Sequence, residues 1–180
     1  MNGSHTIATF ADAYAKGLSG FNLSAAYQAS KKTLAEKSYL PWTRRPKGEL
    51  SEFMDREGYF PGLDIGEKET VPEVTLWEKR QSVAVSLAAA YDYWCLSQLA
   101  KFSGHDVESA DYLRRSYDYR KLFNYDTGFF HPKNKKGRFI EPFNYELSGG
   151  LGARDYYDEN NASTYRWDVQ HNPADILYLM

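Results

Sequence analysis

The sequence is poor in cysteine, in long apolar runs and in excess charge of either sign. Its one cysteine, Cys95, excludes a disulfide within the chain. No apolar run has the roughly 20 residues that span a bilayer. The N-terminus, MNGSHTIATF, has neither the basic start nor the apolar stretch of a signal peptide. The 22 basic and 24 acidic residues nearly cancel, so we expect no nucleic-acid partner and no binding to an anionic membrane surface, while the lack of a long apolar run predicts no membrane span.

Aromatic residues are abundant instead. The 180 residues include 15 Tyr, 10 Phe and 4 Trp, which is 16% of the chain. Large rings are costly to expose, so some of them must form the core. Others are suited to a groove for a ligand with flat apolar faces and hydroxylated edges, such as a sugar. For any single ring, packing between helices is the simpler alternative.

Apolar residues recur with a helical period in two pairs of segments. The first pair is a helix over 7–18 and a second over 22–33 that Asn22 can cap. The other pair is a strongly apolar helix over 82–102 and, after Gly104, a helix over 106–123 whose inner side carries Leu113, Tyr117 and Leu122. Each pair predicts an αα-hairpin.

The intervening segments predict loops at one end of these helices. Residues 38–80 hold four of the seven prolines and read as a long loop over the site, with one helical turn near 50–56. Residues 128–143 predict a small β-hairpin, and helical character returns from about 161 and again from 173. We predict an all-α fold whose αα-hairpins form part of an (α/α)6 toroid. Since the hairpins number about half of a ring, we expect 1–180 to be a fragment that exposes Val83, Leu87 and Trp94.

Several motifs, in order, resemble glycoside hydrolase family 92, the calcium-dependent exo-α-mannosidases. The N-terminal motifs are Gly3-Ser4-His5, Phe10-Ala11-Asp12-Ala13-Tyr14 and Lys16-Gly17. The central motifs are Gly58-Tyr59-Phe60-Pro61, Ser82-Val83, Ala90-Tyr91-Asp92 and Trp94-Cys95. The C-terminal motifs are Arg115-Ser116, Gly128-Phe129, Pro132-Lys133, Tyr157-Asp158-Glu159-Asn160-Asn161-Ala162, Tyr165, Trp167, Val169 and His171.

The resemblance implies a segment of the catalytic (α/α)6 domain of an inverting exo-α-mannosidase that acts on terminal α-mannosides of glycans. It implies that Glu159 is the general acid and that Asn161, Trp167, His171 and His5 bind substrate. It also implies a calcium cofactor, an N-terminal β-sandwich domain and a secreted or periplasmic location. The base and the calcium ligands are expected outside this chain, so no metal ligand is assigned within it.

The residues around Glu159 suit this chemistry. Glycoside cleavage needs a carboxyl group that stays protonated near neutral pH beside the leaving oxygen. Aromatic residues surround Glu159 in the sequence, and burial against them would raise its pKa; they are Tyr156, Tyr157, Tyr165 and Trp167. The alternative is that Glu159 only caps a helix that begins near Asn161. His5 and His171 likewise either line the site or make structural hydrogen bonds.

Two other functions remain open from the sequence. The family motif is altered at Asn160, Ser163, Thr164, Gln170 and Asn172. These differences favour a catalytically degenerate sugar-binding or scaffold protein on the same helical framework. A third possibility is another α/α-toroid glycosidase with a different sugar. Zinc is not expected, because the four histidines are far apart in the sequence.

Overall fold

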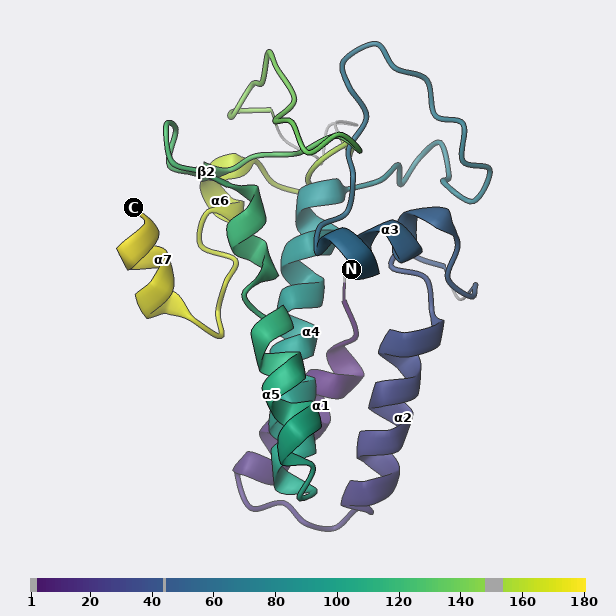
Figure 1. Cartoon of the computed structure of the whole chain (residues 1–180), viewed down its shortest axis with the longest axis vertical. Helices are drawn as coiled ribbons and strands as arrows, with labels where there is room; N and C mark the ends of the chain where they lie inside the picture. Colours follow the sequence, from purple (N-terminus) through teal and green to yellow (C-terminus); the bar gives the residue numbers. More distant parts are fainter. Residues whose placement is uncertain (1–2, 44, 148–153) are drawn as a thin grey trace.

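The computed structural model describes residues 3–43, 45–147 and 154–180. This part of the chain is mainly helical and has one two-stranded sheet (Figure 1). The larger helices are α1 (His5–Ala15), α2 (Leu23–Glu36), α3 (Glu49–Glu57), α4 (Ser82–Phe102) and α5 (Asp106–Arg115). The shorter elements are the 3-10 helix η1 (Asp118–Leu122), β1 (Phe123–Asn124), β2 (Phe129–Phe130), α6 (Ala162–Tyr165) and α7 (Pro173–Leu179).

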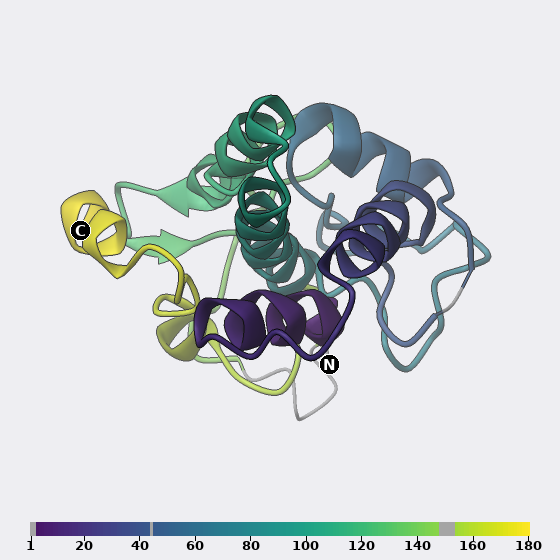
Figure 2. The same ribbon diagram turned by 90° about the horizontal axis from the view of Figure 1, so that it is seen from below.

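Helix α4 is the centre of the molecule. It packs against α1, α2, α5 and η1, which surround it in Figures 1 and 2. Its alanines allow these helices to approach closely, and most of its length is buried. The expected exposure of Val83 and Leu87 is wrong, because both side chains are buried in one cluster with Tyr119, Phe130 and Tyr157. The C-terminal part of this chain therefore covers the face that we expected to be open.

Helices α1 and α2 form the first predicted αα-hairpin. The Asn22 side chain accepts a hydrogen bond from the amide of Ala25 at 2.9 Å, so it caps α2 as expected. Ile7 and Ala11 are the buried residues of α1, whereas Leu18 lies beyond the end of the helix and is exposed. Helix α1 is therefore about one turn shorter at its C-terminus than the periodic pattern predicts.

Helix α5 is also shorter than predicted. It ends at Arg115, and η1 follows, so the chain does not continue as one helix to residue 123. Leu113 and Tyr117 are exposed rather than buried, and only Leu122 of the predicted inner side is in the core. Small polar groups face α4 instead; the Ser109 hydroxyl donates to the carbonyl of Ser97 at 2.9 Å. Helix α5 therefore faces α4 with another side than the one that Leu113 and Tyr117 predict.

Residues 38–80 form a long connection that contains α3, near the predicted turn. Helix α3 ends at Gly58, whose φ of +79° is readily adopted only by glycine. Later in this connection, Arg80 is only 4% exposed and binds Glu69 through two hydrogen bonds of 2.6 and 2.7 Å. It also donates to the carbonyl of Pro61 at 3.1 Å. These contacts tie the end of the connection to its middle.

The β-hairpin forms earlier in the chain than predicted. Strands β1 and β2 pair antiparallel, with Phe123 opposite Phe130. Within 128–143, the described pairing beyond β2 is a single bridge between Lys133 and Phe139. Beyond this bridge the backbone amides of residues 136 and 138 donate to the side-chain oxygen of Asn134, at 2.9 and 3.1 Å. These two hydrogen bonds take the place of further pairing between strands.

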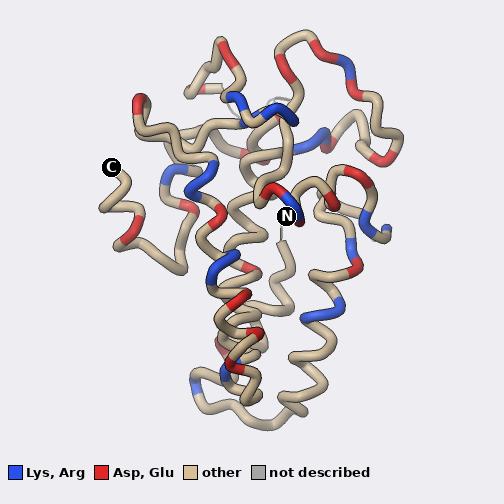
Figure 3. The backbone as a smooth tube through the Cα atoms, viewed as in Figure 1, with Lys and Arg blue, Asp and Glu red and all other residues tan. Residues whose placement is uncertain are grey.

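The loops gather at one end of the helices, above α4 in Figure 1. The connection 58–81, the β-hairpin and α6 all lie there, near the end of α4 that begins at Ser82. Acidic and basic residues occur on both helices and loops (Figure 3). The arrangement therefore agrees with a site formed by loops at one end of the helices, as expected of a toroid.

Candidate active site

A pocket of about 220 Å³ lies between the start of α1, the first half of α4 and the segment around α6. The N-terminal segment contributes Gly3 and His5 to its wall. The other lining residues are Ala84, Leu87, Ala88, Tyr91, Asp92, Asp158, Tyr165, Asp168 and Gln170. We call this cavity the acid pocket, because three carboxyl groups line it.

The N-terminus of α4 holds the segment that leads to Glu159. The amide of Gln81 donates to the carbonyl of Arg154 at 2.9 Å, and the amide of Val83 donates to that of Tyr156 at 2.8 Å. The first amides of a helix have no partner within the helix, so an adjacent extended segment can satisfy them. These bonds fix residues 154–156 on α4 and thereby bring Asp158 into the wall of the pocket.

Asp92 fixes the other wall. Its Oδ2 accepts a hydrogen bond from the amide of Ser4 at 2.5 Å. Gly3 has a φ of +82°, and a Cβ there would lie 3.1 Å from the same oxygen and 3.2 Å from Cβ of Ala88. A glycine at this position lets the backbone approach α4 closely. The contact places His5, the first residue of α1, at the pocket.

Burial changes the acidity of two of the carboxyl groups. It raises the pKa of Asp92 to about 7, against the opposing effect of the Ser4 amide. It also raises the pKa of Asp168 to about 6. The third carboxyl group, that of Asp158, forms an ion pair with Arg154 at 3.2 Å, and Arg154 also pairs with Glu78. The pocket therefore combines an ion-paired carboxylate with two carboxyls that exchange protons near neutral pH.

Glu159 is exposed, which contradicts the burial expected for it. The neighbouring rings are directed elsewhere: the Tyr156 hydroxyl donates to the carbonyl of Leu63 at 3.0 Å, and that of Tyr157 to the carbonyl of Phe130 at 2.5 Å. These tyrosines are close to the acid in the sequence, but their hydroxyls satisfy carbonyls of the loops. Glu159 follows pocket-lining Asp158 directly, and its role as the acid stays a prediction.

The capping alternative for Glu159 is not what the structure shows. Asn161 is the N-cap of α6, and its Oδ1 accepts from the amides of Ser163 at 3.2 Å and Thr164 at 3.4 Å. The side chain of Asn161, predicted to bind substrate, therefore has a structural role in this chain. Trp167 is 59% exposed, and neither residue lines the acid pocket.

The two histidines differ in their surroundings. His5 is exposed and lines the acid pocket, and its role in binding substrate stays a prediction. The Nε2 of His171 lies 3.0 Å from the carbonyl of Ser116, and its ring is 5.9 Å from that of Tyr91. Burial lowers the pKa of His171. His171 is not among the lining residues of the acid pocket but contacts Tyr91, which is, and its hydrogen bond is the structural alternative weighed from the sequence.

Asp92 belongs to one of the family motifs, but a role in the site is predicted from the sequence for neither Asp92 nor Asp168. Asp92 is the one charged residue between positions 82 and 100, inside an otherwise apolar helix. Burying a lone carboxyl group in such a helix costs free energy. The position of Asp92 in the sequence therefore already indicates a specific role. Asp168 stands between Trp167 and Val169 without a comparable pattern. Only the fold brings it to the pocket.

Among the described residues, no group of three or more His, Cys, Asp or Glu side chains is placed to hold a metal ion. We therefore assign no calcium ligand within these residues and derive no step through the ion. None of the helices in the described ranges has the length and apolar character that crossing a membrane requires.

These features agree with a known class of carbohydrate-active enzyme. The family model of the glycosyl hydrolase family 92 catalytic domain matches residues 1–180. The chain therefore belongs to glycosyl hydrolase family 92, as its motifs indicated. No curated protein sequence matches it significantly.

Two solved structures resemble the fold of the chain. The inverting mannosidase BT2199 of family 92 from Bacteroides thetaiotaomicron VPI-5482 matches with a TM-score of 0.79 and 23% identity over 100% of this chain. The α-mannosidase BT3965 from Bacteroides thetaiotaomicron, in complex with mannoimidazole, matches with a TM-score of 0.73 and 25% identity over 94% of this chain. The chain spans only 22% and 20% of these proteins. The predicted all-α fold class, as part of a larger helical domain, is confirmed.

Proposed function

We propose that this chain forms the general-acid side of the active site in an inverting exo-α-mannosidase, with Glu159 as the acid. Membership of family 92 and the mannosidase names of the two similar structures support the reaction. The observation that supports the assignment of the site is the attachment of residues 154–156 to α4, which brings Asp158, the residue directly before Glu159, into the wall of the acid pocket.

In this reaction the Glu159 carboxyl donates its proton to the glycosidic oxygen as the bond from C1 to that oxygen breaks. A water molecule attacks C1 from the opposite face of the ring and transfers its proton to a carboxylate base. In inverting enzymes the two carboxyl groups are about 6.5–9.5 Å apart, which leaves room for this water. The base is expected outside this chain, as are the calcium ligands.

The exposure of Glu159 leaves its carboxyl accessible to a glycan. The burial that keeps the acid protonated must then come from the bound sugar or from other parts of the enzyme. The proposal also includes what the family resemblance implies: a mannose-containing glycan as substrate, an N-terminal β-sandwich domain, and a secreted or periplasmic location.

The test is the substitution Glu159→Gln in the full-length protein. Hydrolysis of methyl α-mannoside, a poor leaving group, should fall by about three orders of magnitude or more, because general acid catalysis is lost. Hydrolysis of α-mannosyl fluoride needs no protonation and should fall much less. Glu52→Gln, at an exposed position on α3, serves as the control and should change neither rate. Equal losses for both substrates, or no loss, would exclude Glu159 as the acid.

A degenerate sugar-binding protein is the second candidate. The exposure of Glu159 and the use of Asn161 as a helix cap both favour it. Calorimetry with α-mannobiose separates the two functions. Binding without release of mannose supports the second candidate, whereas turnover supports the hydrolase.

A further inference from the structure

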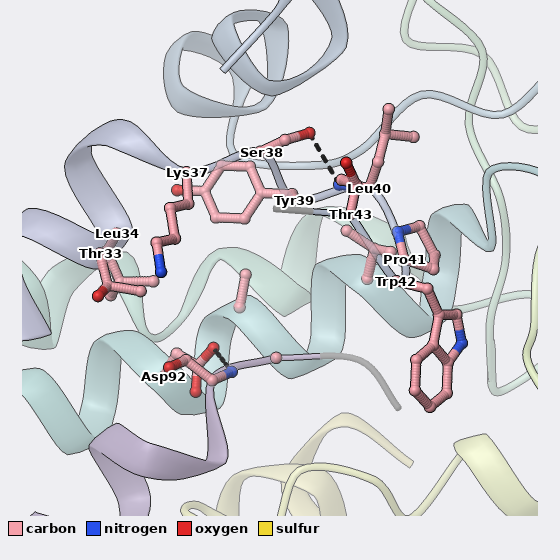
Figure 4. A pocket seen from close by; sticks show the side chains of 14 residues that line it. Thr33, Leu34, Lys37, Ser38, Tyr39, Leu40, Pro41, Trp42, Thr43 and Asp92 are labelled. Carbon is pink, nitrogen blue, oxygen red and sulfur yellow. Dashed lines mark hydrogen bonds between the residues drawn. The ribbon is translucent and has the colours of Figure 1, made fainter. Parts of the chain in front are cut away.

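A second, larger pocket adjoins the acid pocket and has no role in the reaction described above. Its volume is about 430 Å³, and it shares Gly3 and Asp92 with the acid pocket. Its other walls come from the end of α2, the segment 37–43 and the middle of α4 (Figure 4). We call it the tryptophan pocket, after Trp42.

Trp42 stands at the rim of this pocket. Its side chain is 69% exposed, and its backbone has a φ of +57°. Bulky residues rarely adopt this conformation, and it costs of the order of 1 kcal/mol or more. Pro41, directly before it, is buried. The fold thus holds a large indole at the surface at some energetic cost, where it leaves a flat apolar face open to a ligand.

A carboxyl group lies on another side of the pocket. Asp92 is 4% exposed, and Figure 4 shows it across the pocket from Trp42 with its bond to the Ser4 amide. The side chains of Thr33, Lys37 and Thr43 add hydroxyl and amino groups to the walls. The hydroxyl of Tyr39 is already engaged by Asp55 at 2.9 Å and Tyr93 at 2.8 Å, so it is a structural part of the wall.

This combination fits a neutral sugar ring better than an anion or a purely apolar ligand. The apolar face of a hexose stacks on an indole, while its hydroxyls donate to a carboxylate and accept from an ammonium group. A phosphate group would meet the carboxyl of Asp92, and among the described lining residues Lys37 is the one basic side chain to offset it. An apolar ligand would leave these polar groups without partners.

We propose that the tryptophan pocket binds a sugar unit on the leaving-group side of the glycan, with Trp42 as the stacking surface. This inference rests on the proposed function, in which the bond to be cleaved lies at Glu159, the residue that follows pocket-lining Asp158. An exo-acting enzyme must close around the terminal sugar. A wide pocket with an exposed rim is instead suited to the part of the glycan that continues away from the cleaved bond.

The experiment compares Trp42→Ala with the wild-type full-length protein on α-1,2-, α-1,3- and α-1,6-linked mannobiose and on α-mannosyl fluoride. We expect kcat/KM for at least one disaccharide to fall about tenfold, mainly through KM, which corresponds to about 1.4 kcal/mol of lost stacking. The loss for α-mannosyl fluoride, which has no second sugar, should be several-fold smaller. Trp42→Phe should recover much of the disaccharide activity.

The control is Tyr178→Ala, which removes a ring that is 83% exposed on α7, outside both pockets. This variant should leave kcat/KM unchanged both for the disaccharides and for α-mannosyl fluoride. Equal losses on both substrates for Trp42→Ala, or no loss on any disaccharide, would overturn the proposal.

If the wild-type protein cleaves neither the disaccharides nor α-mannosyl fluoride, the proposed function fails. The inference about the tryptophan pocket is then tested separately, by measuring the binding of mannobiose. Calorimetric binding of mannobiose that is lost in Trp42→Ala and kept in Tyr178→Ala would support the pocket. Binding that is absent or independent of Trp42 would refute it.

Discussion

Replacement of Glu69 by Gln should destabilise the protein strongly, because it leaves the buried guanidinium of Arg80 without a counter-charge. The pair has two short hydrogen bonds, and the Glu69 side chain is itself only 20% exposed. Removing one partner of a buried ion pair costs about 3–5 kcal/mol. Since domains of this size are stable by about 5–15 kcal/mol, the loss would be a large fraction of the total.

The same pair predicts a dependence on pH. Burial opposes ionisation of Glu69, but hydrogen bonds from Arg80 and from backbone amides outweigh it and lower its pKa. A carboxyl with a lowered pKa stabilises the fold above the pKa of the unfolded chain, about 4.3. This contribution is lost as the pH falls through the lower folded value. Below pH 4, wild type and Glu69→Gln should therefore become more alike in stability.

Urea unfolding at pH 7 and at pH 3.5 measures both effects. The control is Glu36→Gln, since Glu36 is exposed and only 3.9 Å from Lys32, and it should change the free energy of unfolding by less than about 0.5 kcal/mol. A loss below 1 kcal/mol for Glu69→Gln at pH 7, or a difference from wild type that does not shrink in acid, would refute the reasoning.

Three further substitutions test the local structure by urea unfolding. Gly58→Ala should lower the free energy of unfolding by about 1 kcal/mol or more beyond the loss for Gly66→Ala. Both glycines have positive φ, but a Cβ at Gly58 would lie 2.7 Å from Asp118, whereas a Cβ at Gly66 would meet open space. Equal losses would contradict this. Tyr157→Phe should cost about 1–3 kcal/mol, because a buried carbonyl loses its donor; a neutral result would contradict it. Asp92→Asn should gain stability relative to wild type as the pH rises from about 4 to about 7, because a carboxyl whose pKa is raised in the fold loses stability between its unfolded and its folded pKa; a constant difference over this range would contradict it.

Much of the helical framework could be predicted from the sequence because its signals are local. The apolar arc over 82–102 is so wide that only a central helix can satisfy it, and α4 has these bounds. Asn22 caps α2, and Gly104, with a φ of +77°, ends the turn between α4 and α5. The family could be predicted for the same reason, because its motifs are short runs of neighbouring residues, and the family model confirms it.

The errors lie where distant contacts decide the structure. The side of α5 that faces α4 carries Ser109, whose hydroxyl donates to the carbonyl of Ser97, and apolar periodicity does not reveal this contact. The tyrosines beside Glu159 in the sequence suggest that they enclose it, but two of them donate to carbonyls of remote loops. Proximity along the chain predicts which rings are near residue 159 and not where those rings point. The acid pocket likewise needs three segments that only the fold brings together.

The alkaline side of the pH profile of kcat/KM for methyl α-mannoside tests the role of Glu159 most directly. If Glu159 gives up the proton, wild-type activity must fall as the pH rises through the pKa of this carboxyl, and Glu159→Gln must lose this decline together with most of its activity. A variant that keeps the same alkaline decline would show that another group supplies the proton.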